Sequence, residues 1–259
     1  MAGLADQAAD ACLRLCHHRL LASRAVTPAQ RRAAAKLYTR LLGGALGEDT
    51  PPELLEALHP ELRLTPALTA AAAALPPPAQ PVSSGPGLQL LQFAARFRAA
   101  RAETGTAAAM ELRVVSRWPV PLAAARLKLV FSTGAVEAEL VDEAAPEAQA
   151  ALNLGADAAA ASPALEALRA DFKARPGAAF KGKEEAEGGA SLQQTYDANL
   201  LLEPDVARSF SLDVHLPEAG EALGDVYVKA LQLRFELGGG RALTLETHAV
   251  DLAFDEGEG

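Results

Sequence analysis

Four potential metal ligands lie close together near the N-terminus: Cys12, Cys16, His17 and His18. Thiolate and imidazole groups bind zinc, and a structural zinc site needs four such ligands. On a helix Cys12 and Cys16 share a face, whereas His17 is rotated by about 100° and His18 by about 200°. The four side chains cannot converge without breaking the helix. We therefore expect no metal here and predict that both cysteines pack as small apolar residues.

Residues for nucleophilic or acid–base catalysis do not form a recognisable constellation. No G-x-S-x-G turn is present, so the sequence lacks the strained serine that this class of hydrolase uses. The remaining candidates are scattered along the chain: His59, His215, His248, the pair Glu218 and Glu221, and the pair Asp255 and Glu256. Nothing indicates that the acidic pairs are buried, which tuned catalytic carboxylates require. We predict that the protein is not an enzyme and has no cofactor.

A glycine-rich run at residues 238–240 could suggest a phosphate-binding loop. The run is followed by Arg-Ala rather than Lys-Ser or Lys-Thr, and a strand pattern comes next instead of a helix. Both features differ from a P-loop. The three glycines predict a tight hairpin, because glycine reaches positive φ at little cost.

Three residues are candidates for contacts with a partner protein: Trp118, Arg96 and Arg98. Trp118 is the only tryptophan and lies in ELRVVSRWPVPL, where the prolines favour a corner between two strands. A buried corner residue is the structural interpretation, and a binding hot spot is the functional one. Arg96 and Arg98, with Arg101, either form the solvated side of a strand end or meet an acidic partner.

The bulk composition excludes several classes of function. The chain has 259 residues and a net charge of -9, which argues against nucleic-acid binding because phosphate neutralisation needs a basic face. No apolar run approaches the roughly 20 residues of a membrane-spanning helix. Only two cysteines are present and the N-terminus lacks a signal-peptide layout. We expect a cytoplasmic protein without a transmembrane segment.

The N-terminal third of the chain predicts helices followed by a linker. Apolar residues recur at helical spacing over residues 4–22, and Thr27-Pro28-Ala29-Gln30 resembles an N-cap with proline at the first helical position. A second helix ends at Gly43-Gly44. The two helices predict an α-helical hairpin over residues 1–46, the end of an α-solenoid. Residues 47–87 hold nine prolines and predict a Pro/Ala-rich linker.

Residues 88–259 change to the alternating period of strands. Apolar and polar residues alternate around 91–97, 112–114, 127–131, 136–140, 200–202, 210–216, 231–237 and 243–245. About eight short strands with turns between them, including a hairpin at 132–134, predict an antiparallel immunoglobulin-like β-sandwich. The Ala/Glu/Gly-rich residues 142–197 predict a polar insertion outside the core, with one short helix at 163–173 and a mobile segment at 181–185. The fold class expected is α+β in two parts.

The order of these features resembles the foie gras family of trafficking-protein-particle (TRAPP) complex subunits. The stretches that carry the resemblance are LQLLQFAARF, ELRVVSRWPVPLAAARLKLVF and NLLLEPDVARSFSLDVHLPEAGEALGDVYVKALQLRFELGGGRALTLE. In that family an α-helical region ends and immunoglobulin-like modules follow. Since the family proteins are much longer, we expect this chain to be an internal or truncated piece.

The resemblance implies a scaffold subunit of a vesicle-tethering and Rab guanine-nucleotide exchange complex. It would act in transport between endoplasmic reticulum and Golgi and in autophagy, at the cytoplasmic side of those membranes. Its partners would be other tether subunits and, indirectly, a Rab GTPase. Two alternatives remain open: a free-standing β-sandwich that binds a protein or ligand, and an accessory domain of an enzyme.

Overall fold

The computed structural model describes residues 27–43, 45, 82–83, 90–154, 158–185, 191–217 and 225–248. The helices are α2 (Pro28–Leu42), α5 (Pro146–Asn153) and α6 (Ala158–Ala174). The strands are β1 (Val82–Ser83), β2 (Leu91–Phe97), β3 (Ala107–Ser116), β4 (Leu122–Ala123), β5 (Arg126–Phe131), β6 (Val136–Val141), β7 (Ala178–Glu185), β8 (Leu192–Ala198), β9 (Leu201–Leu202), β10 (Ala207–His215), β11 (Val228–Glu236) and β12 (Ala242–His248). The described chain is therefore mixed α+β, with strands predominating.

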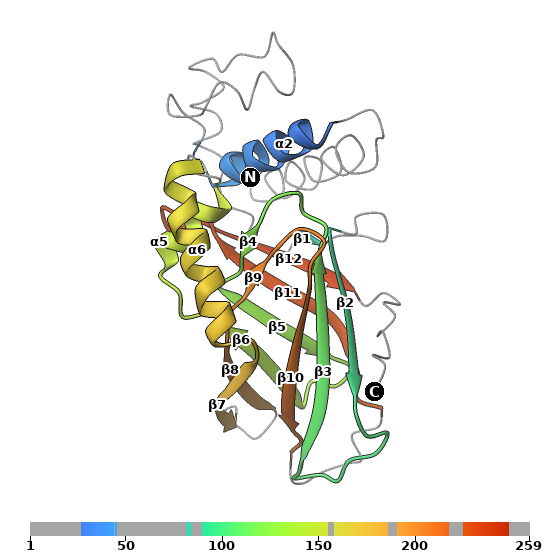
Figure 1. The fold of residues 1–259 in the computed structure, drawn as a ribbon. Helices are drawn as coiled ribbons and strands as arrows, with labels where there is room; N and C mark the ends of the chain where they lie inside the picture. Colours follow the sequence, from blue (N-terminus) through green and yellow to red (C-terminus); the bar gives the residue numbers. More distant parts are fainter. Residues whose placement is uncertain are drawn as a thin grey trace, which may run out of the picture.

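Two larger sheets lie face to face around one core (Figure 1). The larger sheet has the strand order β1-β12-β11-β5-β6-β8-β7, and the smaller has the order β10-β3-β2. Most pairings are antiparallel, as expected. The pairs β1–β12 and β6–β8 are parallel, so the prediction of a purely antiparallel sheet was wrong for these two pairs.

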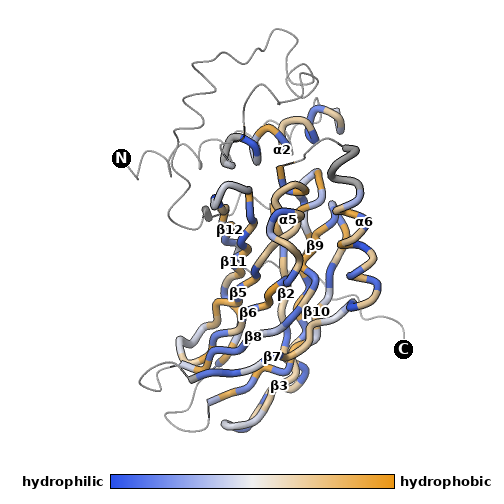
Figure 2. Tube along the Cα trace, turned by 90° about the vertical axis from the view of Figure 1, so that its left-hand side faces the viewer, coloured by the Kyte–Doolittle hydropathy of each residue, from blue (hydrophilic) through white to orange (hydrophobic). Residues whose placement is uncertain are grey.

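The alternation of apolar residues explains why these strands bury one face. In β5 the apolar Leu127, Leu129 and Phe131 are buried and the residues between them are partly exposed. Figure 2 shows the same alternation of hydrophobic and hydrophilic residues along the strands. All eight strand segments predicted from this pattern lie within or overlap strands of the structure. The hairpins predicted at 132–134 and 238–240 connect β5 to β6 and β11 to β12.

Helix α2 begins as the sequence predicted. The Thr27 backbone N–H donates to Gln30 Oε1 at 3.0 Å, and the Gln30 N–H donates to Thr27 Oγ1 at 3.3 Å. This reciprocal pair is a capping box, which satisfies two of the donors that a helix start leaves free. The other helix of the predicted hairpin, at residues 4–22, lies outside the described residues, as do almost all of residues 47–87.

Residues 142–197 were predicted to stay outside the core, and this prediction was wrong. Strand β8 pairs with β6 from Leu192 to Asp197, and its Leu192, Gln194 and Tyr196 are buried. The segment at 181–185, expected to be mobile, belongs to β7, which pairs with β8. Polar residues at buried positions of β8 hid the alternation in the sequence. The helix predicted at 163–173 is confirmed as part of α6.

Helices α5 and α6 cover one side of the two packed sheets (Figure 1). A second small core joins Leu152 of α5 and Leu168 of α6 to Ala123 and Leu201. These last two residues form the short antiparallel pair β4–β9. The helices thus rest on a small third sheet that continues from the Trp118 region.

Candidate functional site

Trp118 lies in the corner between β3 and β4, as the prolines predicted. The Trp118 N–H donates to Ser116 Oγ at 3.2 Å, and the Ser116 carbonyl accepts the Asp205 N–H at 2.8 Å. Pro119 and Pro121 follow in the link to β4, where the absence of their N–H groups interrupts no strand pairing. The corner is therefore fixed by a local hydrogen bond to the Ser116 side chain and by a backbone hydrogen bond from Asp205.

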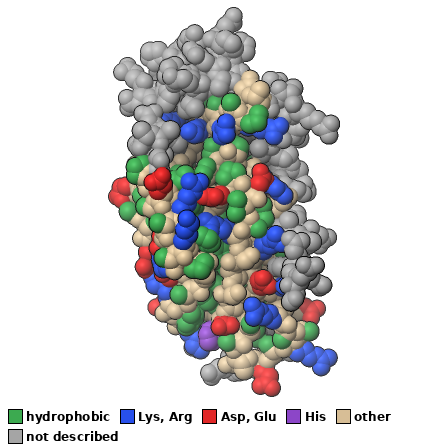
Figure 3. Space-filling model, in the orientation of Figure 1, with side chains coloured by type: hydrophobic (Ala, Val, Ile, Leu, Met, Phe, Trp, Pro, Cys, Tyr) green, Lys and Arg blue, Asp and Glu red, His purple; other side chains and the backbone are tan. Residues whose placement is uncertain are grey.

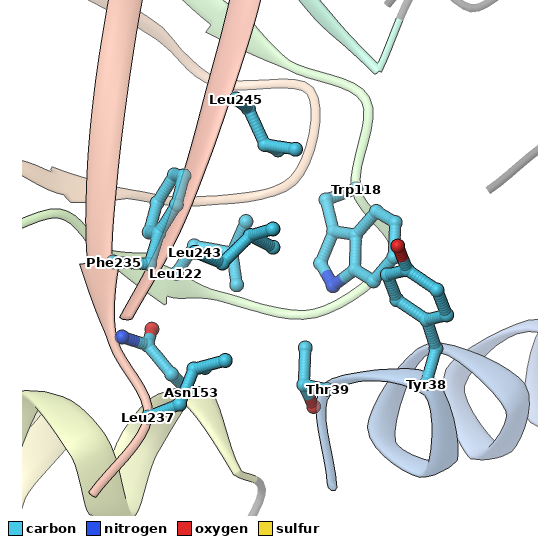
Figure 4. A pocket seen from close by; sticks show the side chains of 9 residues that line it. All are labelled: Tyr38, Thr39, Trp118, Leu122, Asn153, Phe235, Leu237, Leu243 and Leu245. Carbon is cyan, nitrogen blue, oxygen red and sulfur yellow. The ribbon is translucent and has the colours of Figure 1, made fainter. Parts of the chain in front are cut away.

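The indole of Trp118 packs beneath α2 and is only 4% exposed. Its ring centroid is 5.7 Å from that of Tyr38 on α2, with the planes tilted by 55°. This tilted arrangement is one that aromatic pairs prefer. Figure 4 shows the indole next to Tyr38, with Leu243 and Leu245 of β12 on its other side. Trp118 therefore joins the helix to the core, and a partner cannot reach it while α2 is in place.

A small cavity remains between Trp118 and α2. Its volume is about 10 Å³, and its lining includes Thr39, Leu122 and Leu237. The Trp118 Nε1–H is buried and finds no hydrogen-bond acceptor among the described residues. In Figure 4 this nitrogen points toward the interior of the labelled group. An unsatisfied buried donor costs about 1–3 kcal/mol. A water here would need two or more polar partners, and the surrounding side chains are mainly apolar.

The C-terminal end of α2 is held by two further contacts. Arg40 Nε donates to the Leu154 carbonyl at 3.1 Å, just after α5. Gly43 lies so close to its neighbours that a Cβ there would be 2.8 Å from Leu154 Cδ2 and 3.1 Å from the Leu237 carbonyl oxygen. A glycine at this point allows α2 to end against both α5 and the β11–β12 hairpin.

Asn153, which the sequence did not single out, holds the same region together. It is fully buried. Its Oδ1 accepts the Ala123 N–H at 2.8 Å, while Nδ2 donates to the carbonyls of Ala123 and Glu236, each at 2.9 Å. The Asn153 side chain thereby pairs with the backbone of β4 as a neighbouring strand would. The only signal in the sequence was an asparagine among apolar residues near the end of a helix.

Arg96 and Arg98 lie elsewhere and do not form one site with Trp118. Arg96 contacts Glu111 Oε2 at 3.0 Å on the outer face of the β2–β3 pair, with 47% of its side chain exposed. Arg98 is exposed just after β2. In the register Leu91 is opposite Ser116 and Arg96 is opposite Glu111, so Arg96 is about 17 Å along the sheet from the Trp118 corner.

A polar cluster joins α6 to β8 and contains two carboxylates that could serve as an acid–base pair. Arg175 donates to Asp171 Oδ2 at 2.7 Å and to Asp197 Oδ2 at 2.5 Å, and Asn199 Nδ2 donates to Asp171 Oδ2 at 2.8 Å. The hydrogen bond from Arg175 is the main cause that lowers the pKa of Asp171. A carboxylate held in its charged form by a guanidinium is a poor proton donor or acceptor near neutral pH. The cluster therefore fixes α6 in place.

Asp142 is the most deeply buried carboxylate of this region. It is 5% exposed, and burial raises its pKa despite hydrogen bonds from the N–H groups of Leu200 and Ala144. Both of its oxygens accept backbone N–H groups, at 2.8 and 2.9 Å. Asp142 closes the chain reversal after β6 and contacts no nucleophile.

Of the remaining chemical candidates, the described residues include only His215 and His248. His215 is half-buried on β10, and its ring centroid lies 5.0 Å from that of Phe180. His248 is exposed beside Glu246. The candidates Cys12, Cys16, His17, His18, His59, Glu218, Glu221, Asp255 and Glu256 lie outside the described residues. Among the residues that the structure does describe, no three histidine, cysteine or acidic side chains come together as a metal site.

Similarity to known proteins was sought in three ways. No family model, no curated protein and no solved structure matches the chain. In the part of the chain that the structure describes, no helix is long and apolar enough to cross a membrane. The described residues form packed sheets, a docked helix and an exposed polar surface.

Proposed function

We propose that this chain is a non-enzymatic scaffold subunit of a vesicle-tethering complex of the trafficking-protein-particle type. In this proposal it contacts other tether subunits and, through them, a Rab GTPase. It acts at the cytoplasmic side of endoplasmic reticulum and Golgi membranes and in autophagy. The sequence resemblance to the foie gras family is the origin of the proposal.

The observation that carries the proposal is the pairing of seven strands. We propose that the two packed sheets form an immunoglobulin-like sandwich, in which the second and fifth strands pair and the third, sixth and seventh lie side by side. The seven strands, taken in chain order, are β2, β3, β5, β6, β10, β11 and β12. The second and fifth of them, β3 and β10, pair with each other. The third, sixth and seventh are β5, β11 and β12, which are neighbours in that order.

The position of α2 gives the proposal a second support. A helix that precedes the sheets contacts their core through Ala35 and Tyr38, and Trp118 is the residue it rests on. A fixed junction between a helical part and a β part suits a scaffold, whose task is to hold neighbouring subunits at set positions. In this interpretation Trp118 acts on the fold, and partner contacts are made by exposed residues such as Arg96 and Arg98.

Affinity purification of the tagged full chain from its own cells, followed by mass spectrometry, tests the proposal. Recovery of several tether subunits is the expected result, with Arg96→Glu combined with Arg98→Glu reducing it. Recovery of a monomer without partners would favour a free-standing binding module instead. A variant with Arg126→Glu, on the outer face of the larger sheet, is the matched control for a charge reversal.

A further inference from the structure

Arg208 is a charged residue at a position where the strand pattern expects an apolar one. It is only 6% exposed and lies on the same inner face of β10 as Phe210, Leu212 and Val214, all buried. Burying a cation without a partner carries a large cost. Other contacts must therefore stabilise the buried charge of Arg208.

Two contacts hold the guanidinium in place. Arg208 Nε donates to the Leu201 carbonyl at 2.8 Å. The Arg208 Cζ lies 3.2 Å from the centroid of the Phe172 ring on α6, a cation–π arrangement. Burial lowers the pKa of Arg208, and the charge of Glu203 opposes that shift. An arginine keeps its charge under these conditions, since a guanidinium is not deprotonated in proteins.

The nearest acidic group does not neutralise Arg208. Glu203 is engaged by Arg169, whose Nε donates to Glu203 Oε1 at 2.6 Å. No carboxylate of the described residues makes an ion pair with Arg208 itself. The Glu203 carboxylate therefore pairs with Arg169 and, among the described residues, leaves Arg208 without an ion pair, in a chain whose net charge is -9.

The terminal nitrogens of Arg208 are available to a ligand. Within the described residues neither Nη1 nor Nη2 makes a hydrogen bond. Neither atom is among the fully enclosed nitrogens that lack a partner, so each keeps some contact with solvent. Figure 3 shows Lys and Arg side chains on this face with Asp and Glu side chains among them. Val206, 45% exposed, lies two residues away.

We propose that Arg208 is a binding site for a carboxylate, supplied by an acidic side chain of a partner protein. The planar fork of the guanidinium offers two parallel N–H groups to the two oxygens of a carboxylate. Leu201 and Phe172 fix the guanidinium in advance, which reduces the entropy lost on binding. Val206 adds apolar surface beside the charge. The bound carboxylate would supply the charge partner that Arg208 lacks.

A carboxylate fits this site better than a phosphate. Phosphate sites usually combine several cations or backbone N–H groups. Here one guanidinium lacks a carboxylate partner, and Glu203 is close enough to act on it through its charge. The negative charge of Glu203 would repel a dianion more than a monoanion. The proposal does not depend on which complex contains the chain, so its failure and that of the scaffold proposal are distinguishable.

Titration of the full chain with the α-amide of N-acetylglutamate, which carries a single carboxylate, at constant ionic strength tests the site. The readout is the ¹⁵N–¹H NMR signal of the Arg208 Nε–H, assigned by its loss in Arg208→Lys. We expect a saturable shift in the wild type and a dissociation constant about tenfold higher in Arg208→Lys, followed at the remaining shifted backbone amides. Arg126→Gln, which removes an exposed arginine paired with Glu139, should leave the affinity unchanged.

Glu203→Gln separates a binding role from a purely structural one. Removing the competing carboxylate should tighten binding of this α-amide by about tenfold, whereas a structural role for the cluster predicts no gain. Equal responses in the wild type and Arg208→Lys, or weaker binding in Glu203→Gln, would overturn the proposal. Tighter binding of inorganic phosphate than of the α-amide would overturn the choice of a carboxylate.

Discussion

Replacing Trp118 by alanine should destabilise the protein without removing a partner contact. The indole is 4% exposed and packs on Tyr38, and truncating a buried tryptophan to alanine costs about 3–5 kcal/mol. The existing cavity of about 10 Å³ would become large enough to leave α2 poorly supported. We therefore expect a large fall in the free energy of unfolding.

Trp118→Phe is the matched variant. It keeps an aromatic ring against Tyr38 but removes the Nε1–H that has no acceptor. Loss of that unsatisfied donor returns about 1–3 kcal/mol, which offsets much of the cost of a smaller ring. We expect a change in the free energy of unfolding of less than about 1.5 kcal/mol.

Urea unfolding followed by far-ultraviolet circular dichroism measures both variants, since the only tryptophan is the residue changed. Partner recovery by affinity purification is measured in parallel. An unchanged midpoint for Trp118→Ala, together with lost recovery of partners, would refute the structural interpretation and make Trp118 a binding residue. Equal destabilisation by alanine and phenylalanine would show that the unpaired N–H is not a cost.

Three further outcomes are expected. Gln194→Leu should lower the free energy of unfolding by about 2–4 kcal/mol, because the Gln194 side chain forms hydrogen bonds with both the N–H and the carbonyl of His215. The control Gln193→Leu changes an exposed residue of β8 and should alter the free energy of unfolding little in the same urea titration. Asn153→Ala leaves three buried backbone groups unpaired and should cost at least as much, and preserved stability would contradict that role. The pKa of Asp171 is lower in the folded protein than its ordinary value of 3.8. The ionised carboxylate therefore stabilises the fold at pH values above 3.8, and this stability is lost as the pH falls through the folded pKa. Asp171→Asn should reduce this loss in unfolding curves measured from pH 6 to pH 2.

The strands of the two packed sheets were predictable because each carries a local signal. Alternation in RLKLVF fixes which residues of β5 face inward, and the three glycines at 238–240 fix the hairpin, with φ of 80°, 59° and 74°. The Thr27 capping box is equally local. Such signals need only the chemistry of neighbouring residues.

The role of residues 142–197 could not be read locally. In β8, LQQTYDA places Gln194 at a buried position where an apolar residue is expected. A polar side chain is tolerated at this buried position because Gln194 accepts a hydrogen bond from the His215 N–H in β10, a strand later in the chain. Arg208 was missed for the same reason, since its burial depends on Phe172 and Leu201. Long-range hydrogen bonds replaced the apolar contacts that sequence patterns detect.

We propose that the chain holds other subunits together in a tethering complex. Native mass spectrometry of the assembly purified through the tagged full chain tests this role most directly. We expect one copy of this chain in a defined assembly with several tether subunits. A single species at the mass of the chain alone, 26.9 kDa plus the tag, would contradict it.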